Sequence, residues 1–386
     1  MSVQLGSPEN YGIDRIKALH DLGYLPIEIR ALPEGTVVNM GVPVVEMTNS
    51  HEDFAWVVQW IECILQAEVW SASAYATVGH EYYKVANLEN YDEVYRAVAF
   101  FAFKYGRIDW LETNNEYWLL RDAQLRTDFN VTTGLQNQNI DGIKFKSKMK
   151  EYYAKAGVPT ARYHLVDTLE NGLAFVKDAG YPVIVKPDNG VGAAATYKLK
   201  NEEELRNFYA NLPEVQYVME EFINGSIVSY DGICDSNRDI IFETCHFYTE
   251  PVMDVVNKGL ELCYYSRKQI PEELKDAGRR TIKAFDSNSR FFHCEFFVLN
   301  EDKEGLGKKG DILGLEVNMR PSGGWSADMF NFANSCDVYK IWADMIAFNK
   351  RTVDNQNAEH FFCCYCGRRD GKNFVLDHEA LMAKYG

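Results

Sequence analysis

Hydrophobic and polar positions recur with two different periods along the chain, and these periods predict its helices and strands. Between residues 50 and 70 the apolar side chains follow helical spacing, at Phe54, Val57, Val58, Ile61, Leu65 and Val69. This spacing predicts one amphipathic helix. Residues 25–49 instead carry short β-forming runs between turn signals such as Pro-Glu-Gly, which predicts a small sheet of hairpins. The N-terminal region is therefore expected to fold as a small packed unit.

From about residue 141 onward, predicted helices and strands alternate. Helices are predicted at about 145–156, 168–179, 201–212 and 271–285, with one long helix at 326–349 and an earlier helix at 90–104. Strands are predicted at about 158–166, 182–186, 197–199, 214–223, 226–235, 238–248, 290–300 and 311–320. This order indicates a mixed α+β protein with more than one sheet.

Composition narrows the classes of partner. The chain has 386 residues, enough for two or three domains, and a formal net charge of −16. Such an acidic chain is not expected to bind a nucleic-acid backbone or an anionic membrane surface. No apolar run approaches the ~20 residues of a membrane helix, and the first residues do not resemble a signal peptide. Together with nine scattered cysteines, these features predict a cytoplasmic protein with reduced thiols.

A charged residue ends the apolar strand "PVIVK". Lys186 would be a buried cation there, and an unpaired buried ammonium is costly. The following residues 188–195 include Gly190, Gly192 and Ala193, and such small residues let backbone N–H groups approach a phosphate closely. On these residues alone, a plain β-hairpin and a phosphate-covering loop are equally good interpretations.

A second group of polar residues lies in "LGLEVNMRPSGG". Glu316, Asn318 and Arg320 are spaced two apart, so they should project from one face of a strand. Glu295 is an isolated acid among aromatic residues in the preceding strand. Two carboxylates and an amide on neighbouring strands form an oxygen-donor set suited to Mg²⁺. The alternative is a simple ion pair between Glu316 and Arg320 on a solvated sheet face, which explains Glu295 less well.

Three cysteines cluster near the end of the chain, in "FFCCYCGRR". Cys364 and Cys366 would share one face of a strand, as in half of a zinc site. No second pair of Cys or His at ligand spacing completes such a site in the sequence. We therefore expect ordinary thiols in a strand, and no zinc.

These segments, in this order, resemble the ATP-grasp proteins of the carboxylate–amine ligase and biotin-carboxylase type. The resemblance runs from about residue 82 to the end of the chain. It rests on "KSKMKEYYAKAGVPT", "VIVKPDNGVGAAA", "YVMEEFINGS", "HCEFF" and "LEVNMRPSGG". It implies an α+β fold of two subdomains that hold ATP between them, preceded by a small α/β N-terminal region.

The resemblance also implies roles for individual residues. Lys146, Lys186, Gly190, Gly192 and Ala193 would hold the phosphates of ATP, and Glu220, Glu221 and Ile223 would hold adenine, mostly through their backbone. Glu295, Glu316 and Asn318 would bind Mg²⁺, with Mn²⁺ as an alternative. Arg320 and Lys186 would act in catalysis, with Arg320 holding either an anionic substrate or the transferring phosphoryl group.

The implied reaction joins a small carboxylate to an amine. The γ-phosphoryl group passes to the carboxylate, and an amine then attacks the acyl phosphate to give an amide, ADP and phosphate. The partners are thus small molecules, with a homodimer as one form of assembly.

The front end resembles a different family. Residues 11–80, with "LPIEIRALPEGTVVNMGVPVV", are similar to a fragment of nicotinamide phosphoribosyltransferase. The expected divisions are a structural fragment at 1–83, a connecting region at 84–140, an ATP-grasp domain at 141–349 and a completing segment at 350–386. Two alternatives to the ligase follow: a phosphoribosyltransferase of NAD salvage, and an ATP-binding protein without turnover because its front end is composite.

Overall fold

The computed structural model describes residues 13–33, 36, 45–58, 61, 82–190, 195–250, 255, 260–285, 288–353, 358–368, 372 and 374–385. The chain divides into two compact units, Met1–Glu89 and Asn90–Gly386. In the first unit, α1 (Ile13–Leu22) precedes an antiparallel pair of β1 (Ile27–Ala31) and β2 (Val45–Asn49), in which Ile27 lies opposite Asn49. The predicted hairpin sheet is therefore confirmed for its described strands.

The predicted helix at 50–70 falls largely outside the described residues. Its described part begins with a short 3₁₀ turn, η1 (Glu52–Phe54), and continues as helix at 56–58. Phe54 and Val57 are buried, as their spacing predicts.

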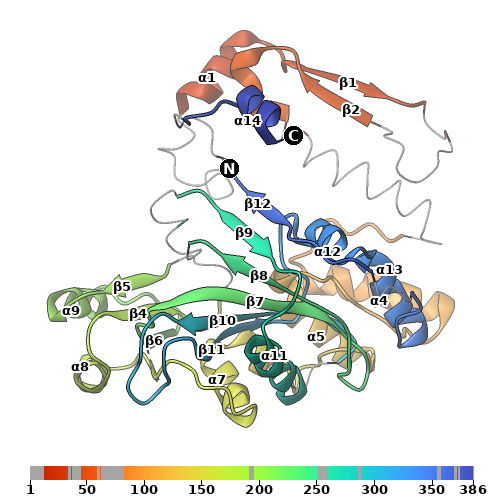
Figure 1. Ribbon diagram of the computed structural model, residues 1–386. Coiled ribbons are helices and arrows are strands. Elements are labelled where there is room, and N and C mark those ends of the chain that lie inside the picture. The colour runs from red at the N-terminus through yellow and green to blue at the C-terminus, as the bar shows by residue number, and fades with distance from the viewer. Residues whose placement is uncertain are drawn as a thin grey trace. The chain divides into compact units, whose positions relative to one another are not determined.

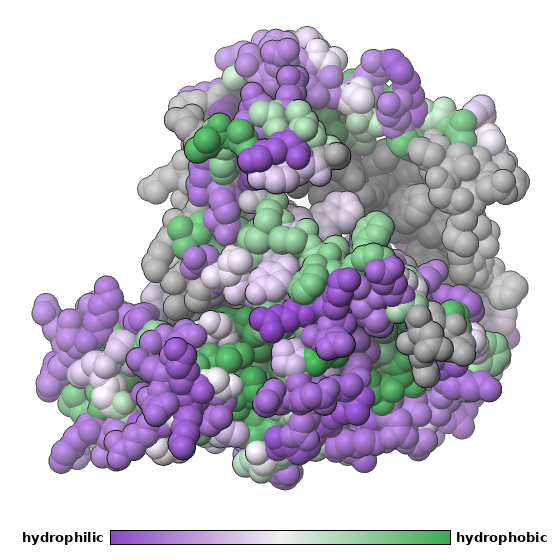
Figure 2. All heavy atoms as spheres, viewed as in Figure 1, coloured by the Kyte–Doolittle hydropathy of each residue, from purple (hydrophilic) through white to green (hydrophobic). Residues whose placement is uncertain are grey.

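The second unit begins with helices and then forms a small lobe. The helices are α4 (Tyr91–Tyr105), η3 (Glu116–Trp118), α5 (Leu119–Asp128) and α6 (Asp141–Lys144). The small lobe is an antiparallel sheet with the strand order β3-β6-β4-β5, where β3 is Tyr163–Leu165, β4 Val183–Pro187, β5 Tyr197–Leu199 and β6 Tyr217–Glu221. Helices α8 (Leu169–Ala179) and α9 (Glu202–Ala210) cover this sheet, and the outer surface they present is mainly polar (Figure 2).

A six-stranded antiparallel sheet forms the large lobe of this unit (Figure 1). Its order is β11-β10-β7-β8-β9-β12, with β7 at Gly225–Cys234, β8 at Ile240–Tyr248, β9 at Cys263–Ser266, β10 at Arg290–Leu299, β11 at Ile312–Asn318 and β12 at Cys364–Cys366. Helices α7 (Lys146–Lys155) and α11 (Glu272–Ala284) pack on one face of the sheet. The helices and strands predicted over 141–320 are thereby confirmed, with shifts of a few residues at their ends.

The prediction of one long helix at 326–349 is wrong. The segment forms two helices, α12 (Ser326–Asn334) and α13 (Val338–Phe348). Ser335 adopts a left-handed conformation with φ 47°, and the Asp337 side chain then accepts a hydrogen bond from the backbone N–H of Lys340. Apolar periodicity continues across this break, so it masked the helix-capping signal of Asp337. A last helix, α14, spans His378–Tyr385.

Within the described ranges, no helix has both the length and the apolar character needed to cross a membrane. Many of the apolar residues are buried in the hydrophobic cores of the two lobes. The larger core lies between the six-stranded sheet and the helices α7 and α11, and a separate core fills the small lobe.

One close contact sets the distance between α7 and the large sheet. Tyr153 of α7 is fully buried, and its ring lies directly over Gly314 of β11. A Cβ at position 314 would lie 2.4 Å from Tyr153 Cε1, so no larger residue fits there without movement. The Tyr153 hydroxyl also donates toward the backbone carbonyls of Glu295 and Glu316, at 3.3 and 3.2 Å.

We predict that Gly314→Ala destabilises the protein, because the added methyl group must push Tyr153 away from the sheet. The expected loss is about 1–3 kcal/mol in the free energy of unfolding, measured by urea denaturation. Gly323→Ala is the matched control, since a Cβ there meets no atom within 4 Å. Equal stability of the two variants would show that α7 does not rest on this contact.

Candidate functional site

Lys146 is the first residue of α7, and the end of β4 fixes its position. The Asp188 carboxylate accepts hydrogen bonds from the Ser147 backbone N–H (2.7 Å) and the Ser147 hydroxyl (2.8 Å), and its backbone carbonyl accepts from Lys146 N–H. These bonds satisfy donors that a helix N-terminus leaves unpaired. The Lys146 ammonium donates to the Gly190 carbonyl at 2.9 Å and lies 3.3 Å from Glu316 Oε1. Lys146 therefore bridges the loop after β4 and the large sheet.

Lys186 lies on β4, as predicted, and its ammonium is buried in an ion-pair network. Glu220 of β6 lies between two lysines, with Lys186 Nζ at 2.8 Å and Lys150 Nζ at 2.6 Å. Burial opposes the charge of Glu220, but the two ammonium groups outweigh it and lower the pKa of Glu220 to about 2. Burial lowers the pKa of Lys150, whereas for Lys186 the carboxylates of Glu220, Glu316 and Glu295 outweigh burial and raise the pKa.

The predicted metal ligands are brought together by the pairing of β10 with β11. Glu295 lies directly opposite Glu316, and Asn318 lies opposite His293, with a bulge immediately after Glu295. His293 Nε2 lies 3.5 Å from Glu295 Oε1, and its Nδ1 lies 2.6 Å from the buried carboxylate of Asp231. Burial opposes ionisation of Glu295, yet His293 and Arg320 together hold its pKa below the ordinary value. Glu295 is thus an ionised carboxylate at neutral pH.

Arg320 follows β11 and pairs with a residue that the sequence did not indicate. Its Nη2 lies 2.5 Å, and its Nε 3.1 Å, from Glu116 Oε2 of η3. The region before residue 141 therefore contributes a carboxylate to the site. Lys144 also lies nearby, because Glu116, Lys146 and Glu316 all influence its pKa, which burial lowers overall.

The segment predicted to hold adenine lies at the end of β6. Glu221 is fully buried, and its carboxylate accepts from the Arg162 guanidinium at 2.8 and 3.1 Å and from the Arg162 backbone N–H. Ile223 is buried with Leu299 and Leu313. The side chains of Glu220 and Glu221 thus serve ion pairs within the protein, and the prediction that their backbone holds adenine stays untested. Gly192 and Ala193 lie outside the described residues, so the predicted loop can be followed only to Gly190.

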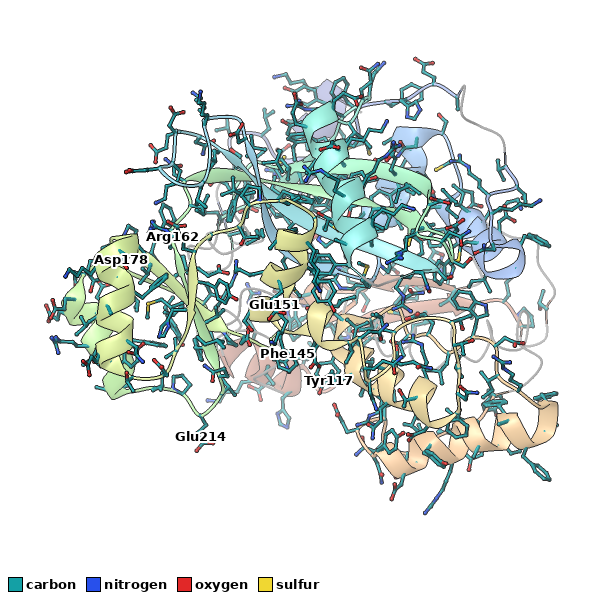
Figure 3. The ribbon with its side chains drawn as sticks, turned by 90° about the horizontal axis from the view of Figure 1, so that it is seen from below. Tyr117, Phe145, Glu151, Arg162, Asp178 and Glu214 are labelled. Carbon is teal, nitrogen blue, oxygen red and sulfur yellow. The ribbon has the colours of Figure 1, made fainter. Side chains whose placement is uncertain are left out.

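The two sheets bring their charges together at α7. Figure 3 shows α7, marked by Phe145 and Glu151, beside the small lobe that carries Arg162, Asp178 and Glu214. Lys146 and Lys150 are one helical turn apart, so both reach the same side of α7. Lys146 contacts Glu316 of the large sheet, while Lys150 contacts Glu220 of the small sheet. The helical spacing of these lysines could have identified Lys150, which the sequence interpretation missed.

The donor set fits a hard cation and an anionic substrate. Glu295, Glu316 and Asn318 offer carboxylate and amide oxygens on adjacent strands, which are ligands that Mg²⁺ prefers. Lys146, Lys186 and Arg320 place positive charge around them. Lys146, Lys186 and Arg320 each pair with a carboxylate. An incoming polyphosphate and its metal ion would therefore replace ion pairs that these residues already form.

Comparison with known proteins assigns this part of the chain. The sequence model of a family described as "ATP-grasp domain" matches residues 146–324. A carbamoyl phosphate synthase large chain from Methanothermobacter thermautotrophicus is 26% identical over 157 residues, or 39% of this chain and 14% of that protein. Residues 146–324 are an ATP-grasp domain. The expected ATP-grasp fold is therefore confirmed.

Two solved structures share the fold. An L-amino acid ligase from Bacillus licheniformis has a TM-score of 0.54 at 18% identity, covering 69% of this chain and 63% of its own. The biotin carboxylase domain dimer of Hydrogenobacter thermophilus 2-oxoglutarate carboxylase, in complex with MgADP, ADP and bicarbonate, has a TM-score of 0.55 at 19% identity. That comparison covers 77% of this chain and 66% of the other.

A second similarity, to a different family, covers a short segment at high sequence identity. A nicotinamide phosphoribosyltransferase from Acinetobacter baylyi is 51% identical over 70 residues, which is 18% of this chain and 14% of that protein. The expected resemblance to a fragment of that family is confirmed. The chain thus spans about one seventh of the length of each curated relative described here.

We predict that Glu220 makes the protein acid-sensitive. Its folded pKa of about 2 lies below the ordinary value of 4.5, so its stabilisation is complete above pH 4.5 and is lost as the pH falls toward 2. Glu220→Gln should be less stable by roughly 3 kcal/mol at pH 7, because two buried ammonium groups lose their partner. This gap should narrow between pH 5 and 3 in urea unfolding experiments.

The exposed Glu203 provides the control for this experiment. Glu203→Gln should match the wild-type protein at every pH. A stability gap for Glu220→Gln that stayed constant down to pH 3 would show that the Glu220 carboxylate does not hold the lysines.

Proposed function

We propose that the chain is an ATP-dependent ligase that joins a small carboxylate to an amine and releases ADP. The observation that carries this proposal is the position of α7, whose Lys146 contacts Glu316 of the large sheet and whose Lys150 shares Glu220 with Lys186 of the small sheet. Cations of α7 and the small lobe and oxygen donors of the large lobe thus face one region. A triphosphate with its divalent cation needs both kinds of group at this distance.

In the proposed mechanism, catalysis depends mainly on positive charge placed around the phosphates. Lys146 and Lys186 leave their carboxylate partners to neutralise phosphate oxygens, while Lys150 keeps Glu220 paired. Glu295, Glu316 and Asn318 would hold Mg²⁺, or Mn²⁺, which supplies charge neutralisation at the phosphates when bound. Arg320, close to Glu295, would orient the carboxylate that accepts the γ-phosphoryl group. The resulting acyl phosphate is then open to attack by the amine, which releases phosphate and forms an amide.

The remaining assignments complete the proposal. Gly190, Gly192 and Ala193 would cover the phosphates, and the backbone of Glu220, Glu221 and Ile223 would hold adenine. Residues 1–83 would be a structural fragment, 84–140 a connecting region, 141–349 the ATP-grasp domain and 350–386 its completing segment. The protein would act in the cytoplasm, with a homodimer as one form of assembly.

We predict that Lys186→Ala weakens ATP binding about 10- to 100-fold, because it removes a charged partner of the phosphates. The fold should persist, since Glu220 keeps its contact with Lys150. Titration calorimetry with ATP and Mg²⁺ measures this affinity. Lys148→Ala is the control, because Lys148 is an exposed lysine of the neighbouring helix α7 that pairs with Glu151.

An unchanged ATP affinity in Lys186→Ala would remove Lys186 from the nucleotide site. A weakened affinity that Lys148→Ala reproduces would indicate only a general effect of net charge.

We predict that Glu316→Ala lowers ADP release at least roughly 100-fold while leaving the circular dichroism spectrum unchanged. The assay follows ADP over a panel of carboxylates, with and without amino acids as amines. The exposed Glu304 supplies a control, and Glu304→Ala should retain activity. An active Glu316→Ala variant would exclude Glu316 as an essential metal ligand.

The same assay separates the two alternative functions. The 70-residue similarity to a nicotinamide phosphoribosyltransferase supports the first alternative, for which nicotinamide should cause pyrophosphate release. The second alternative, an ATP-binding protein without turnover, should bind ATP and Mg²⁺ but release no ADP with any carboxylate or amine of the panel. ADP release that depends on a carboxylate favours the ligase over both.

A further inference from the structure

Three thiols from distant parts of the chain meet at the edge of the large sheet. Cys263 begins β9, whereas Cys364 and Cys366 lie on β12, about one hundred residues further along. Their sulfur atoms are separated by 2.8 Å (Cys263–Cys366), 3.5 Å (Cys364–Cys366) and 3.7 Å (Cys263–Cys364). From the sequence, Cys364 and Cys366 were identified as a possible half of a zinc site, and no zinc was predicted. The sequence could not show that Cys263 would complete the group.

Strand pairing explains why the three sulfurs converge. Cys366 lies directly opposite Cys263, while the neighbouring backbone hydrogen bonds run from Gly367 N–H to Leu262 and from Ser266 N–H to Cys363. Cys263 and Cys366 therefore form a non-hydrogen-bonded pair, the kind in which opposite side chains lie closest. Cys364 is two residues before Cys366 and so shares its face of β12. The backbone, and not a chance side-chain rotamer, brings the thiols together.

The spacing of the thiols suits a single small cation. A Zn–S bond is about 2.3 Å, so two sulfurs of a tetrahedral zinc site lie about 3.8 Å apart. Two of the three observed separations are within a few tenths of an ångström of this value, and the third needs only a side-chain rotation to open. Cys364 and Cys366 are exposed, so a cation can enter from solvent and keep one position for water.

We propose that Cys263, Cys364 and Cys366 bind one thiolate-preferring closed-shell cation of the Zn²⁺ class. Each thiol that becomes a ligand gives up its proton to solvent, and no sulfur is oxidised. Because binding displaces these protons, the cation should bind more tightly as the pH rises. This metal site is separate from the proposed Mg²⁺ site, whose ligands are oxygens.

Such a cation would hold the edge strand in place. β12 pairs with β9 through three residue pairs only, Cys364 with Tyr265, Tyr365 with Tyr264 and Cys366 with Cys263. A short edge strand of this kind gains stability from a metal bound across it, because the metal binds the folded pair and not the separated strands. Zn²⁺ should therefore raise the unfolding temperature of the reduced protein.

The test uses the reduced 386-residue chain, freed of metal by a chelator and titrated with Zn²⁺ against a zinc-binding dye. We expect one Zn²⁺ per chain, and at least about 100-fold weaker binding in Cys263→Ser and in Cys364→Ser. Cys363→Ser is the matched control, because Cys363 adjoins the group but projects to the opposite face of the strand. Cys364 is exposed, so its substitution should not prevent folding.

Three results would overturn the proposal. One is an absence of Zn²⁺ binding by the reduced wild-type chain, and another is equal binding by the wild-type chain and Cys364→Ser. The third is the loss of two free thiols in air without metal uptake, reversible by dithiothreitol, which would mean that Cys263 and Cys366 form a disulfide instead. The assay does not depend on ATP turnover, so its outcome is independent of the proposed ligase activity.

Discussion

The arrangement of the site depends on carboxylates that hold buried lysines. Glu220 holds Lys150 and Lys186, and Glu316 lies against Lys146. An unpaired buried charge costs several kcal/mol, so these pairs require β4, β6, α7 and β11 to be in place together. The same requirement makes the site ready for a charged ligand. In the proposed function, phosphate oxygens and a divalent cation would replace partners that are already positioned, so binding would need little rearrangement of the backbone.

Helix α7 connects the fold to the chemistry. Its N-terminus is tied to Asp188 after β4, and its buried Tyr153 rests on Gly314 of β11. Lys146 therefore cannot move independently of either sheet. The hydroxyl of Tyr153 also contacts the backbone carbonyls of Glu295 and Glu316, which ties α7 to both strands that carry these carboxylates. One helix thus determines where the cations of the small lobe and the oxygen donors of the large lobe meet.

The sequence predicted those features that depend on local spacing. The helices and strands of residues 141–320 carry their own periodicity and caps, and the two-residue spacing of Glu316 and Asn318 is a property of one strand. Features that depend on pairing between distant segments could not be predicted. They include the register that sets Glu295 opposite Glu316, the pairing of Glu116 with Arg320, and the approach of Cys263 to Cys364 and Cys366. The break at Ser335 was missed because apolar spacing continues across it.

In the proposed function, lysines of α7 and the small lobe and oxygen donors of the large lobe surround one triphosphate. A crystal structure of the chain with a non-hydrolysable ATP analogue and Mg²⁺ tests this most directly. We expect the Lys146 and Lys186 ammonium groups to contact phosphate oxygens, and Glu295, Glu316 and Asn318 to bind a cation. A nucleotide bound elsewhere, or bound here with the Lys186–Glu220 and Lys146–Glu316 pairs unchanged and no cation at β10 and β11, would contradict it.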